Sequence, residues 1–282
     1  MTTAFVILHY RTFEITVSCL EQLFKVAPDS PIVVVDNGSG DGSGEALCEE
    51  FGGRVAVLIN EDNLGFARGN NAGYKYVKEH YKADCVVVMN NDVIITQPDF
   101  TTILASYMKE NDLDVCGPDI VTPDDKHQNP MFRKPFSTFR ILKQMAIDIV
   151  RIAMLKLHLF ERRILSTYTT VSNSFQKQDV ADLSNITDCI LHGSCIAYSS
   201  NYLSKEDFAF VPVTFLYGEE MILFDYCQRK KYRTGVCISA QVTHLGGRTI
   251  MNGSVPREKQ IFKAKQTVKS LWQLVKLRLF KS

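Results

Sequence analysis

The sequence lacks the features that would mark a nucleic-acid-binding, zinc-binding or membrane-spanning protein. Its 32 lysines and arginines are balanced by 31 aspartates and glutamates, so the formal net charge of +1 gives no general attraction for nucleic acid. The eight cysteines are scattered, with no two at metal-ligand spacing. This argues against a zinc site and is typical of buried free thiols in a reducing compartment. No run approaches the roughly 20 apolar residues of a transmembrane helix.

The first residues also lack the pattern of a secretory signal. Met1 to Ala4 contain no basic residue, and the apolar run from Ala4 to Leu8 is too short for the hydrophobic region of such a signal. Together with the scattered cysteines, this leads us to expect a cytoplasmic protein.

What the sequence does contain is a regular alternation of apolar strands and amphipathic helices over its first 120 residues. With 282 residues, 45% of them hydrophobic and 22% charged, the chain can form one large globular domain or two small ones. Strands are expected at 4–9, 32–35, 55–59, 86–89 and 114–118, and helices at 14–26, 45–51, 66–81 and 100–109. The alternation predicts an α/β fold with a doubly wound, mostly parallel sheet and helices on both faces.

The pattern becomes less regular after residue 122. A polar loop is expected at 123–134, then a helical insertion at 136–166 with one long helical pattern over 139–165, and then an unpatterned polar stretch at 168–185. A β segment is expected at 186–198, a helix from about 216 to 231, a strand at 234–239 and a basic amphipathic helix at 259–280. The fold should therefore carry a helical insertion and an amphipathic C-terminal helix besides its sheet.

The strand at 86–89 ends in polar residues that suit a metal site. Asn90, Asn91 and Asp92 follow an unbroken apolar run, and in an open α/β sheet the carboxyl ends of the strands are where ligands bind. A single carboxylate flanked by amides suits a hard divalent cation that keeps waters and shares a diphosphate. Asn and Asp are also common in plain strand-end turns, so that structural alternative stays open at this point.

Two glycine-containing segments suggest a nucleotide site. Asp36 ends a buried strand before Asn37-Gly38-Ser39, and its carboxylate could accept the imide N–H of a uracil or thymine ring. The segment 63–73 places glycines and small residues at a helix start, where free N–H groups and the helix dipole favour a phosphate. A helix-capping turn and close helix–sheet packing are the structural alternatives. Neither segment is a Rossmann loop, which would have to follow the first strand.

Two later segments carry candidate acid–base and ligand residues. Glu219 and Glu220 open a helix, and one of them could take a proton from an acceptor hydroxyl, although the helix dipole alone also explains acids there. His244 stands beside two glycines and could be a metal ligand, with Arg248 near a phosphate. A lone histidine is more often neither.

The order of these segments resembles the family 2 glycosyltransferases of GT-A fold, in particular the bacterial rhamnosyltransferase-like members. The resemblance runs roughly from Ala4 to Arg248. It is carried by Asp36-Asn37-Gly38-Ser39, the segment 63–73, Asn90-Asn91-Asp92, Gly218-Glu219-Glu220 and His244. It implies a GT-A fold and a Mg²⁺- or Mn²⁺-dependent, inverting transfer of a sugar from a nucleoside diphosphate.

The resemblance also implies roles for individual residues. Asp92 would hold the cation, as the one acid in a motif often written Asp-x-Asp, and His244 would complete the metal or diphosphate contacts. Glu220 takes the position of the general base, where the family usually has Asp, so Glu219 stays an alternative. The residues expected around the nucleotide and sugar are His9, Asp36, Asn37, Ser39, Asn63, Gly65, Arg68, Asn70, Asn91, Gly193 and Arg248.

The same resemblance divides the chain and suggests its substrates. Residues 1–255 would form the GT-A domain, with a nucleotide-sugar-binding half at 1–120 and an acceptor half at 121–255, and residues 256–282 the C-terminal helix. We expect transfer of a sugar, with rhamnose as the leading candidate, from a dTDP- or UDP-linked donor. The acceptor would be a hydroxyl of a glycan or lipid-linked molecule in cell-surface polysaccharide synthesis.

Two other functions stay open from the sequence. A sugar-nucleotide pyrophosphorylase shares this type of sheet, but it would need a glycine-rich phosphate loop after the first strand, where Tyr10-Arg11 is a poor match. A non-catalytic nucleotide-sugar-binding module would make the acids Asp92 and Glu220 incidental.

Basic and apolar residues are combined in the pattern at 139–165 and again in the C-terminal helix. Such amphipathic helices suit an anionic membrane surface, so peripheral association with the inner face of the cell membrane is one expectation. The alternative is that both helices pack on the core or on a second subunit, as in a homodimer.

Overall fold

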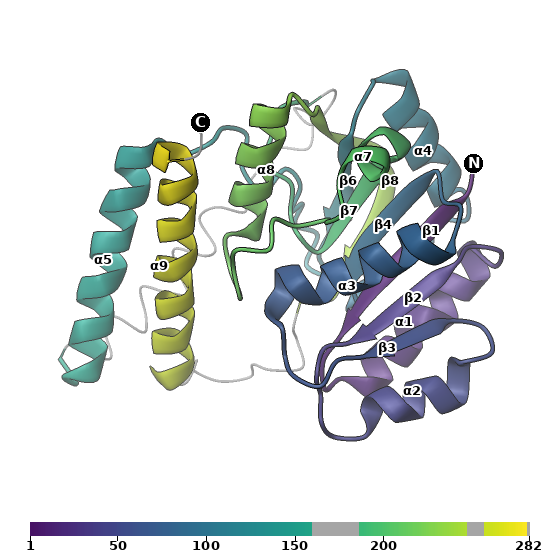
Figure 1. Cartoon of the computed structure of the whole chain (residues 1–282), viewed down its shortest axis with the longest axis horizontal. Coiled ribbons are helices and arrows are strands. Elements are labelled where there is room, and N and C mark those ends of the chain that lie inside the picture. Colours follow the sequence, from purple (N-terminus) through teal and green to yellow (C-terminus); the bar gives the residue numbers. More distant parts are fainter. Residues whose placement is uncertain (160–185, 247–256, 281–282) are drawn as a thin grey trace.

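The computed structural model describes residues 1–159, 186–246 and 257–280, which form a sheet with helices packed around it (Figure 1). The strands are β1 (Thr3–His9), β2 (Ile32–Asp36), β3 (Ala56–Ile59), β4 (Cys85–Asn90), β5 (Val93–Ile94), β6 (Val115–Val121), β7 (Cys195–Ser199) and β8 (Thr234–His244). The helices are α1 (Phe13–Val26), α2 (Ser43–Phe51), α3 (Gly65–His80), α4 (Phe100–Glu110), α5 (Thr138–Lys156), α7 (Ser200–Lys205), α8 (Glu219–Lys230) and α9 (Arg257–Phe280).

The described strands form an 8-stranded sheet in the order β3-β2-β1-β4-β7-β6-β8-β5. Strands β3, β2, β1 and β4 are parallel to one another, and β6 is parallel to β8. β7 runs antiparallel to β4 and β6, and β5 runs antiparallel to β8. The predicted α/β fold with a mostly parallel sheet is therefore confirmed.

Successive residues of the central strands pack against two separate layers of helices. In β1, Phe5 and Ile7 lie in a core cluster with residues of α1, α2 and α4. Ala4 and Val6, which point to the opposite face, lie in a second cluster with residues of α3, α7 and α8. Strands that are buried on both faces need continuous apolar runs rather than alternation, which is why these strands could be recognised in the sequence.

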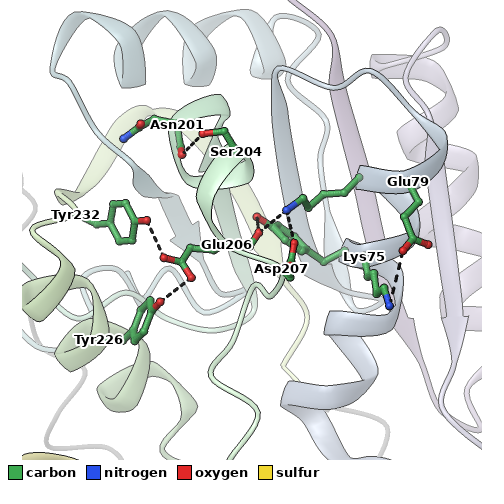
Figure 2. A network of polar contacts seen from close by, with 10 residues as sticks. Lys75, Glu79, Asn201, Ser204, Glu206, Asp207, Tyr226 and Tyr232 are labelled. Atoms are coloured by element: carbon green, nitrogen blue, oxygen red, sulfur yellow. Dashed lines mark hydrogen bonds and ion pairs between the residues drawn. The ribbon is translucent and has the colours of Figure 1, made fainter. Parts of the chain in front are cut away.

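A buried carboxylate fixes α8 relative to the helices on its face of the sheet. Glu206, just after α7, accepts hydrogen bonds from the hydroxyls of Tyr226 at 2.6 Å and Tyr232 at 2.7 Å (Figure 2). The backbone carbonyl of Glu206 accepts a further bond from Nζ of Lys78 on α3 at 2.8 Å. These bonds join α3, α7 and α8, and α8 carries the acid pair Glu219-Glu220 at its start.

Outside the two layers, α9 lies between α5 and α8 (Figure 1). Arg278 of α9 forms an ion pair with Asp225 of α8 at 2.8 Å. One apolar face of the amphipathic C-terminal helix is therefore covered by protein, while Phe262, Trp272, Leu279 and Phe280 stay exposed. No described helix has the length and apolarity that crossing a membrane requires. The three helices share one apolar cluster, made of Ile141, Met145, Ile222, Leu271, Leu274, Val275 and Leu277.

The strands of the second half differ from the prediction. The β segment expected at 186–198 is a strand only from Cys195 to Ser199, because the residues before it form isolated bridges, Thr187 with Gly235 and Ile190 with Phe132, and no continuous ladder. β8 runs on to His244 rather than ending at 239, since its last residues pair with β5. β5 has two residues and gives no pattern that a sequence reading could detect.

Two predicted helix boundaries were also wrong. The helix expected at 139–165 ends at Lys156, because His158 adopts a left-handed conformation with φ of 57°. The remainder of the predicted helical insertion, from residue 160, lies outside the described residues. α8 begins at Glu219 rather than near 216, because Gly218 is left-handed with φ of 88° and precedes the first helical residue.

Candidate active site

Three strands of the sheet end side by side at the edge where the predicted site residues lie. In the parallel register, His9 of β1 pairs with Asp36 of β2, and Leu8 pairs with Asn90 of β4. The amide of Asn90 also donates to the carbonyl of Ser194, the residue before β7, at 2.9 Å. Segments more than a hundred residues apart thus meet at the edge where ligands bind in α/β folds.

Asp36 is held in a tight turn between β2 and α2. Its Oδ1 accepts the amide of Ser39 at 3.1 Å and also the Ser39 hydroxyl. Its Oδ2 lies so close to Gly44 that a β-carbon there would be 2.3 Å away, so a side chain at residue 44 would have to displace the carboxylate. The amide of Arg11 donates to Ser39 Oγ at 2.9 Å. The Asp36 carboxylate is therefore fixed in place at the strand end and is 2% exposed.

Asn37 joins the turn after β2 to the start of α3. Its Nδ2 donates to Asn63 Oδ1 at 3.2 Å and to the carbonyl of Gly65 at 3.1 Å. Its Oδ1 accepts from Asn60 Nδ2 and from the amide of Leu64, each at 3.2 Å. Three residues expected around the nucleotide, Asn37, Asn63 and Gly65, are thus neighbours, and their bonds to one another set the position of the α3 N-terminus.

His9 and Asn91 are joined through a residue that the sequence did not single out. Thr16 Oγ1 lies 2.8 Å from His9 Nδ1 and accepts from Asn91 Nδ2 at 2.7 Å. The other ring nitrogen of His9 lies 2.8 Å from Ser43 Oγ. Burial lowers the pKa of His9, against the opposing charges of Asp36 and Asp41. With both nitrogens bonded and no exposed surface, His9 holds the strand end together rather than presenting a free nitrogen.

The structure brings the two predicted metal ligands together. His244 Nε2 lies 3.3 Å from Asp92 Oδ1. His244 Nδ1 donates to Gln128 Oε1 at 2.7 Å, so Nε2 is the ring nitrogen that faces Asp92. Two electron-pair donors at this distance require a proton or a cation between them.

The donor set can be compared with what a divalent cation needs. Within the described residues, no group of three or more His, Cys, Asp or Glu is arranged to hold a metal ion. Mg²⁺ is commonly held by one or two protein carboxylates together with substrate phosphates and waters. Asp92 and His244 therefore fit a cation that a diphosphate also binds, and they do not form a complete protein cage.

His192 is a site residue that the sequence reading missed. Its ring packs edge-on against that of His244, with centroids 5.6 Å apart. Its Nδ1 accepts the amide of Ser194 at 3.2 Å, and its own amide donates to Asn129 Oδ1 at 2.7 Å. Burial, and then the neighbouring His244, lower the pKa of His192 to about 4, so the ring is neutral at pH 7. Its place beside Gly193 was the one sequence signal that could have found it.

Glu220 faces the predicted site across Gly193. A β-carbon on Gly193 would be 2.8 Å from Glu220 Oε1, so the absence of a side chain at residue 193 makes room for the carboxylate. Burial raises the pKa of Glu220, against backbone N–H bonds from Glu220 itself and Gly193. Because Ser194 is bonded to Asn90, this carboxylate is held near the end of β4.

Glu219 has a different environment from its neighbour. It is 3% exposed, and its Oε1 has no hydrogen-bond partner in the described part of the chain. Burial, and then the adjacent Glu220, raise the pKa of Glu219 to about 8. At pH 7 this carboxyl therefore prefers its protonated form, which suits a buried structural acid better than a general base.

The remaining predicted residues differ in how they relate to this edge. Asn70 is fully buried; its Nδ2 donates to the carbonyl of Phe66 at 2.9 Å, and its Oδ1 has no partner among the described residues. Arg68 is exposed and lines a cavity next to α9. Arg248 lies outside the described residues.

Comparison with known proteins identifies the family. Residues 4–169 match the sequence model of Glycosyl transferase family 2, which covers more than half of the chain. The chain belongs to glycosyl transferase family 2. The match includes Asp36, Asn63 and Asp92, whereas Gly193, Glu220 and His244 lie beyond it. No curated protein matches the sequence.

Solved structures of glycosyltransferases share the fold of this family 2 member. A mannosyltransferase, PcManGT, from Pyrobaculum calidifontis in complex with GDP-Man and Mn²⁺ has a TM-score of 0.53 at 12% identity, covering 99% of this chain and 76% of that one. S. aureus TarS 1–349 in complex with UDP has a TM-score of 0.52 at 15% identity, covering 100% and 67%. Its complex with UDP-GlcNAc has a TM-score of 0.53 at 16% identity, covering 100% and 68%. The predicted GT-A fold is therefore confirmed.

Proposed function

We propose that this protein is an inverting glycosyltransferase that moves a sugar from a nucleoside-diphosphate donor to an acceptor hydroxyl. The observation that carries the proposal is the connection between Asn90, Ser194 and Gly193. Asn90 is bonded to Ser194, and Gly193 packs on Glu220. A candidate base and a candidate cation site, Asp92 with His244, are thereby built onto the same strand end.

In this proposal Glu220 is the general base and Glu219 is not. A general base works best when its pKa lies nearer to the working pH than the value of about 4.3 for free Glu. Burial raises the pKa of Glu220 in that direction. The two backbone N–H groups that bond its charged form keep the carboxylate available and oriented. Glu219, which is nearly inaccessible, has no open path to an acceptor.

Asp92 and His244 would hold a Mg²⁺ or Mn²⁺ ion together with the donor diphosphate. A bound cation would stabilise the negative charge of the departing nucleoside diphosphate. Gln128 orients His244 by accepting from its Nδ1, a common way of fixing the ring of a metal-binding histidine. The structure of PcManGT with GDP-Man and Mn²⁺ supports divalent metal use in proteins of this fold.

The identities of the donor and the acceptor that we propose are based on the family resemblance. The family resemblance implies that the Asp36 carboxylate contacts the nucleobase, and on that basis we propose a dTDP- or UDP-linked donor, with rhamnose as the leading sugar. S. aureus TarS 1–349 has been solved with UDP and with UDP-GlcNAc, which supports a nucleotide-sugar partner in this fold. The acceptor we propose is a hydroxyl of a glycan or lipid-linked molecule in cell-surface polysaccharide synthesis.

We place the reaction in the cytoplasm, at the inner face of the cell membrane, and assign the membrane contact to α5. Because α9 packs between α5 and α8, its residues Leu271, Leu274, Val275 and Leu277 are covered by protein. α5 instead exposes Phe139, Leu142, Ile149 and Val150, which lie within about 100° of one another around the helix. Basic residues on the same helix would favour anionic lipids. A second copy of the chain is the competing occupant of this face.

The test is a screen of nucleotide sugars by thermal unfolding, with and without Mn²⁺, followed by detection of released nucleoside diphosphate. A bound ligand raises the melting temperature by mass action, so we expect one donor class to do so in the presence of Mn²⁺. Release of nucleoside diphosphate would exclude a non-catalytic binding module. If no nucleotide sugar raises the melting temperature, the proposal fails.

Adding pyrophosphate to the same incubation tests whether the protein is a pyrophosphorylase. That enzyme would form nucleoside triphosphate and sugar phosphate when pyrophosphate is added to the donor. The segment after β1 argues against it, since Arg11 donates its Nε to the carbonyl of Ser39 at 3.0 Å instead of standing free beside a glycine-rich loop.

A further inference from the structure

A cavity of about 630 Å³ lies outside the strand-end site, between the first turn of α3, the segment before α8 and the middle of α9. Arg68 contributes from α3, Phe215 from the segment before α8, and Phe262, Lys269 and Trp272 from α9. Because these elements are far apart in the sequence, neither the motif order nor the family match, which ends at residue 169, assigns this cavity.

The cavity shares a wall with the candidate base. Phe215 lies in the short segment that leads into Glu219 and Glu220, and its carbonyl accepts the amide of Phe66 at 2.7 Å. The next carbonyl in that segment, from Leu216, accepts the hydroxyl of Ser270 on α9 at 3.1 Å. A molecule in the cavity would therefore contact the segment that positions the acid pair.

Exposed aromatic side chains gather at this cavity. Phe215, Phe262 and Trp272 are 37%, 42% and 46% exposed, although each is large and apolar. Single exposed apolar residues are ordinary, but several around one concavity mark a ligand site. Flat aromatic faces suit the C–H faces of sugar rings, and the side-chain amides of Gln266 and Gln273, which also line the cavity, suit sugar hydroxyls.

The charge of the lining is of one sign. Arg68 and Lys269 are its charged members, and no Asp or Glu of the described residues lines the cavity. Neither cation forms an ion pair with any residue in the described part of the chain. Two cations that have no ion-pair partner among the described residues, beside aromatic surface, would attract a phosphate or a carboxylate.

We propose that this cavity is an acceptor subsite that binds an anionic glycan. Sugar rings stack on Trp272 and Phe262, and a phosphate or carboxylate of the glycan pairs with Arg68 and Lys269. The inference rests on the proposed function, since it places the part of the acceptor that does not react. It also changes the expected role of Arg68 from the nucleotide sugar to the acceptor.

Trp272 is the one tryptophan of the chain, so its fluorescence reports directly on this cavity without any donor or turnover. The probes are an oligogalacturonate, which carries carboxylates, a phosphomannan oligosaccharide, which carries phosphates, and a neutral malto-oligosaccharide of similar length. We expect a saturable change in emission with at least one charged probe, at least tenfold tighter than with the neutral one. The charged probe that binds identifies the anionic group.

Lys269→Gln should weaken that binding at least tenfold, and Arg68→Gln should act in the same direction. Lys265→Gln is the matched control, because Lys265 is exposed on the same helix and does not line the cavity. The absence of a saturable change with either charged probe would overturn the proposal, as would equal loss from the Lys265 variant. Donor binding is measured separately by thermal shift, so the failure of the subsite and the failure of the glycosyltransferase proposal give different results.

Discussion

Gly193 lies against the carboxylate of Glu220 so closely that a β-carbon at residue 193 would be 2.8 Å from Glu220 Oε1. This contact connects the loop before β7 to the first turn of α8. It also separates the two acids of the pair, because Glu220 is placed at the strand-end site while Glu219 is enclosed in the protein.

The Gly193 contact predicts that Gly193→Ala impairs turnover and leaves the fold intact. The added methyl group meets the end of a flexible side chain, so Glu220 moves and the backbone does not have to. We expect kcat to fall at least tenfold with an unchanged melting temperature and unchanged donor affinity. Gly53→Ala is the control, since a β-carbon there meets nothing within 4 Å. Normal turnover by Gly193→Ala would remove Glu220 from the reaction.

Substitution of each acid separates the two candidates for the general base. Glu220→Gln should lower kcat by roughly 10²–10⁴, the usual contribution of a general base, while nucleotide affinity stays the same. Glu219→Gln should retain turnover within about tenfold, because Gln resembles the protonated form that Glu219 already prefers. Steady-state kinetics and calorimetric nucleotide titration on both variants check this. The opposite pattern would make Glu219 the base.

The raised pKa of Glu219 predicts how stability depends on pH. An acid that is harder to ionise in the folded protein stabilises the fold below its unfolded pKa of about 4.5, and this contribution is lost as pH rises through about 8. Glu219→Gln removes this loss of stability at high pH, because Gln does not ionise. The melting temperature of the variant relative to wild type should therefore increase between pH 5 and pH 8.5. A constant difference over this range would show that Glu219 is ionised in the folded protein at neutral pH.

Gln128 should affect the metal although it does not contact it. Gln128→Leu removes the acceptor of the His244 Nδ1 bond, so the ring can turn away from Asp92. We expect Mn²⁺ affinity in the presence of nucleoside diphosphate to fall 10- to 100-fold, the range seen for partners of ligand residues, and Asp92→Asn to cost more. Titration calorimetry measures both. Nucleotide binding without metal should be the same in all three proteins.

Membrane binding through α5 predicts that Phe139→Ser with Ile149→Ser abolishes flotation with vesicles rich in phosphatidylglycerol. Both side chains are exposed, so the fold should be unaffected. Phe280→Ser on α9, which is equally exposed, is the control and should float like wild type. Flotation of the double variant would contradict the assignment to α5. Loss of a dimer in size-exclusion chromatography instead would show that the face binds a second subunit.

Much of the first half of the fold could be predicted because its strands are buried on both faces. The run from Val86 to Met89 is readable without knowing its neighbours, and Asn90 to Asp92 at its end marked the site. The proximity of Asp92 and His244 was also expected, because the resemblance implied that both would contact a cation or a diphosphate.

The rest of the site depends on contacts that leave no local pattern. Gln128 contacts His244 from a loop of polar residues, and no pattern in the sequence of that loop distinguishes Gln128 from its neighbours. The position of Arg68 beside α9 depends on how the last helix packs. An amphipathic pattern predicts that one face of a helix will be covered, but it does not distinguish lipid from a neighbouring helix. The sequence alone therefore could not decide whether α9 contacts a membrane or protein.

The hydrogen bond between Ser270 and Leu216 has a consequence for the order in which the protein folds during its synthesis. The segment that leads into the acid pair is hydrogen-bonded to a helix that begins about forty residues later in the chain. A nascent chain that has reached only residue 256 contains every strand of the described sheet, yet it lacks the helix that contacts the loop before α8. The arrangement of this loop should therefore be completed late, as the ribosome finishes residues 257–280.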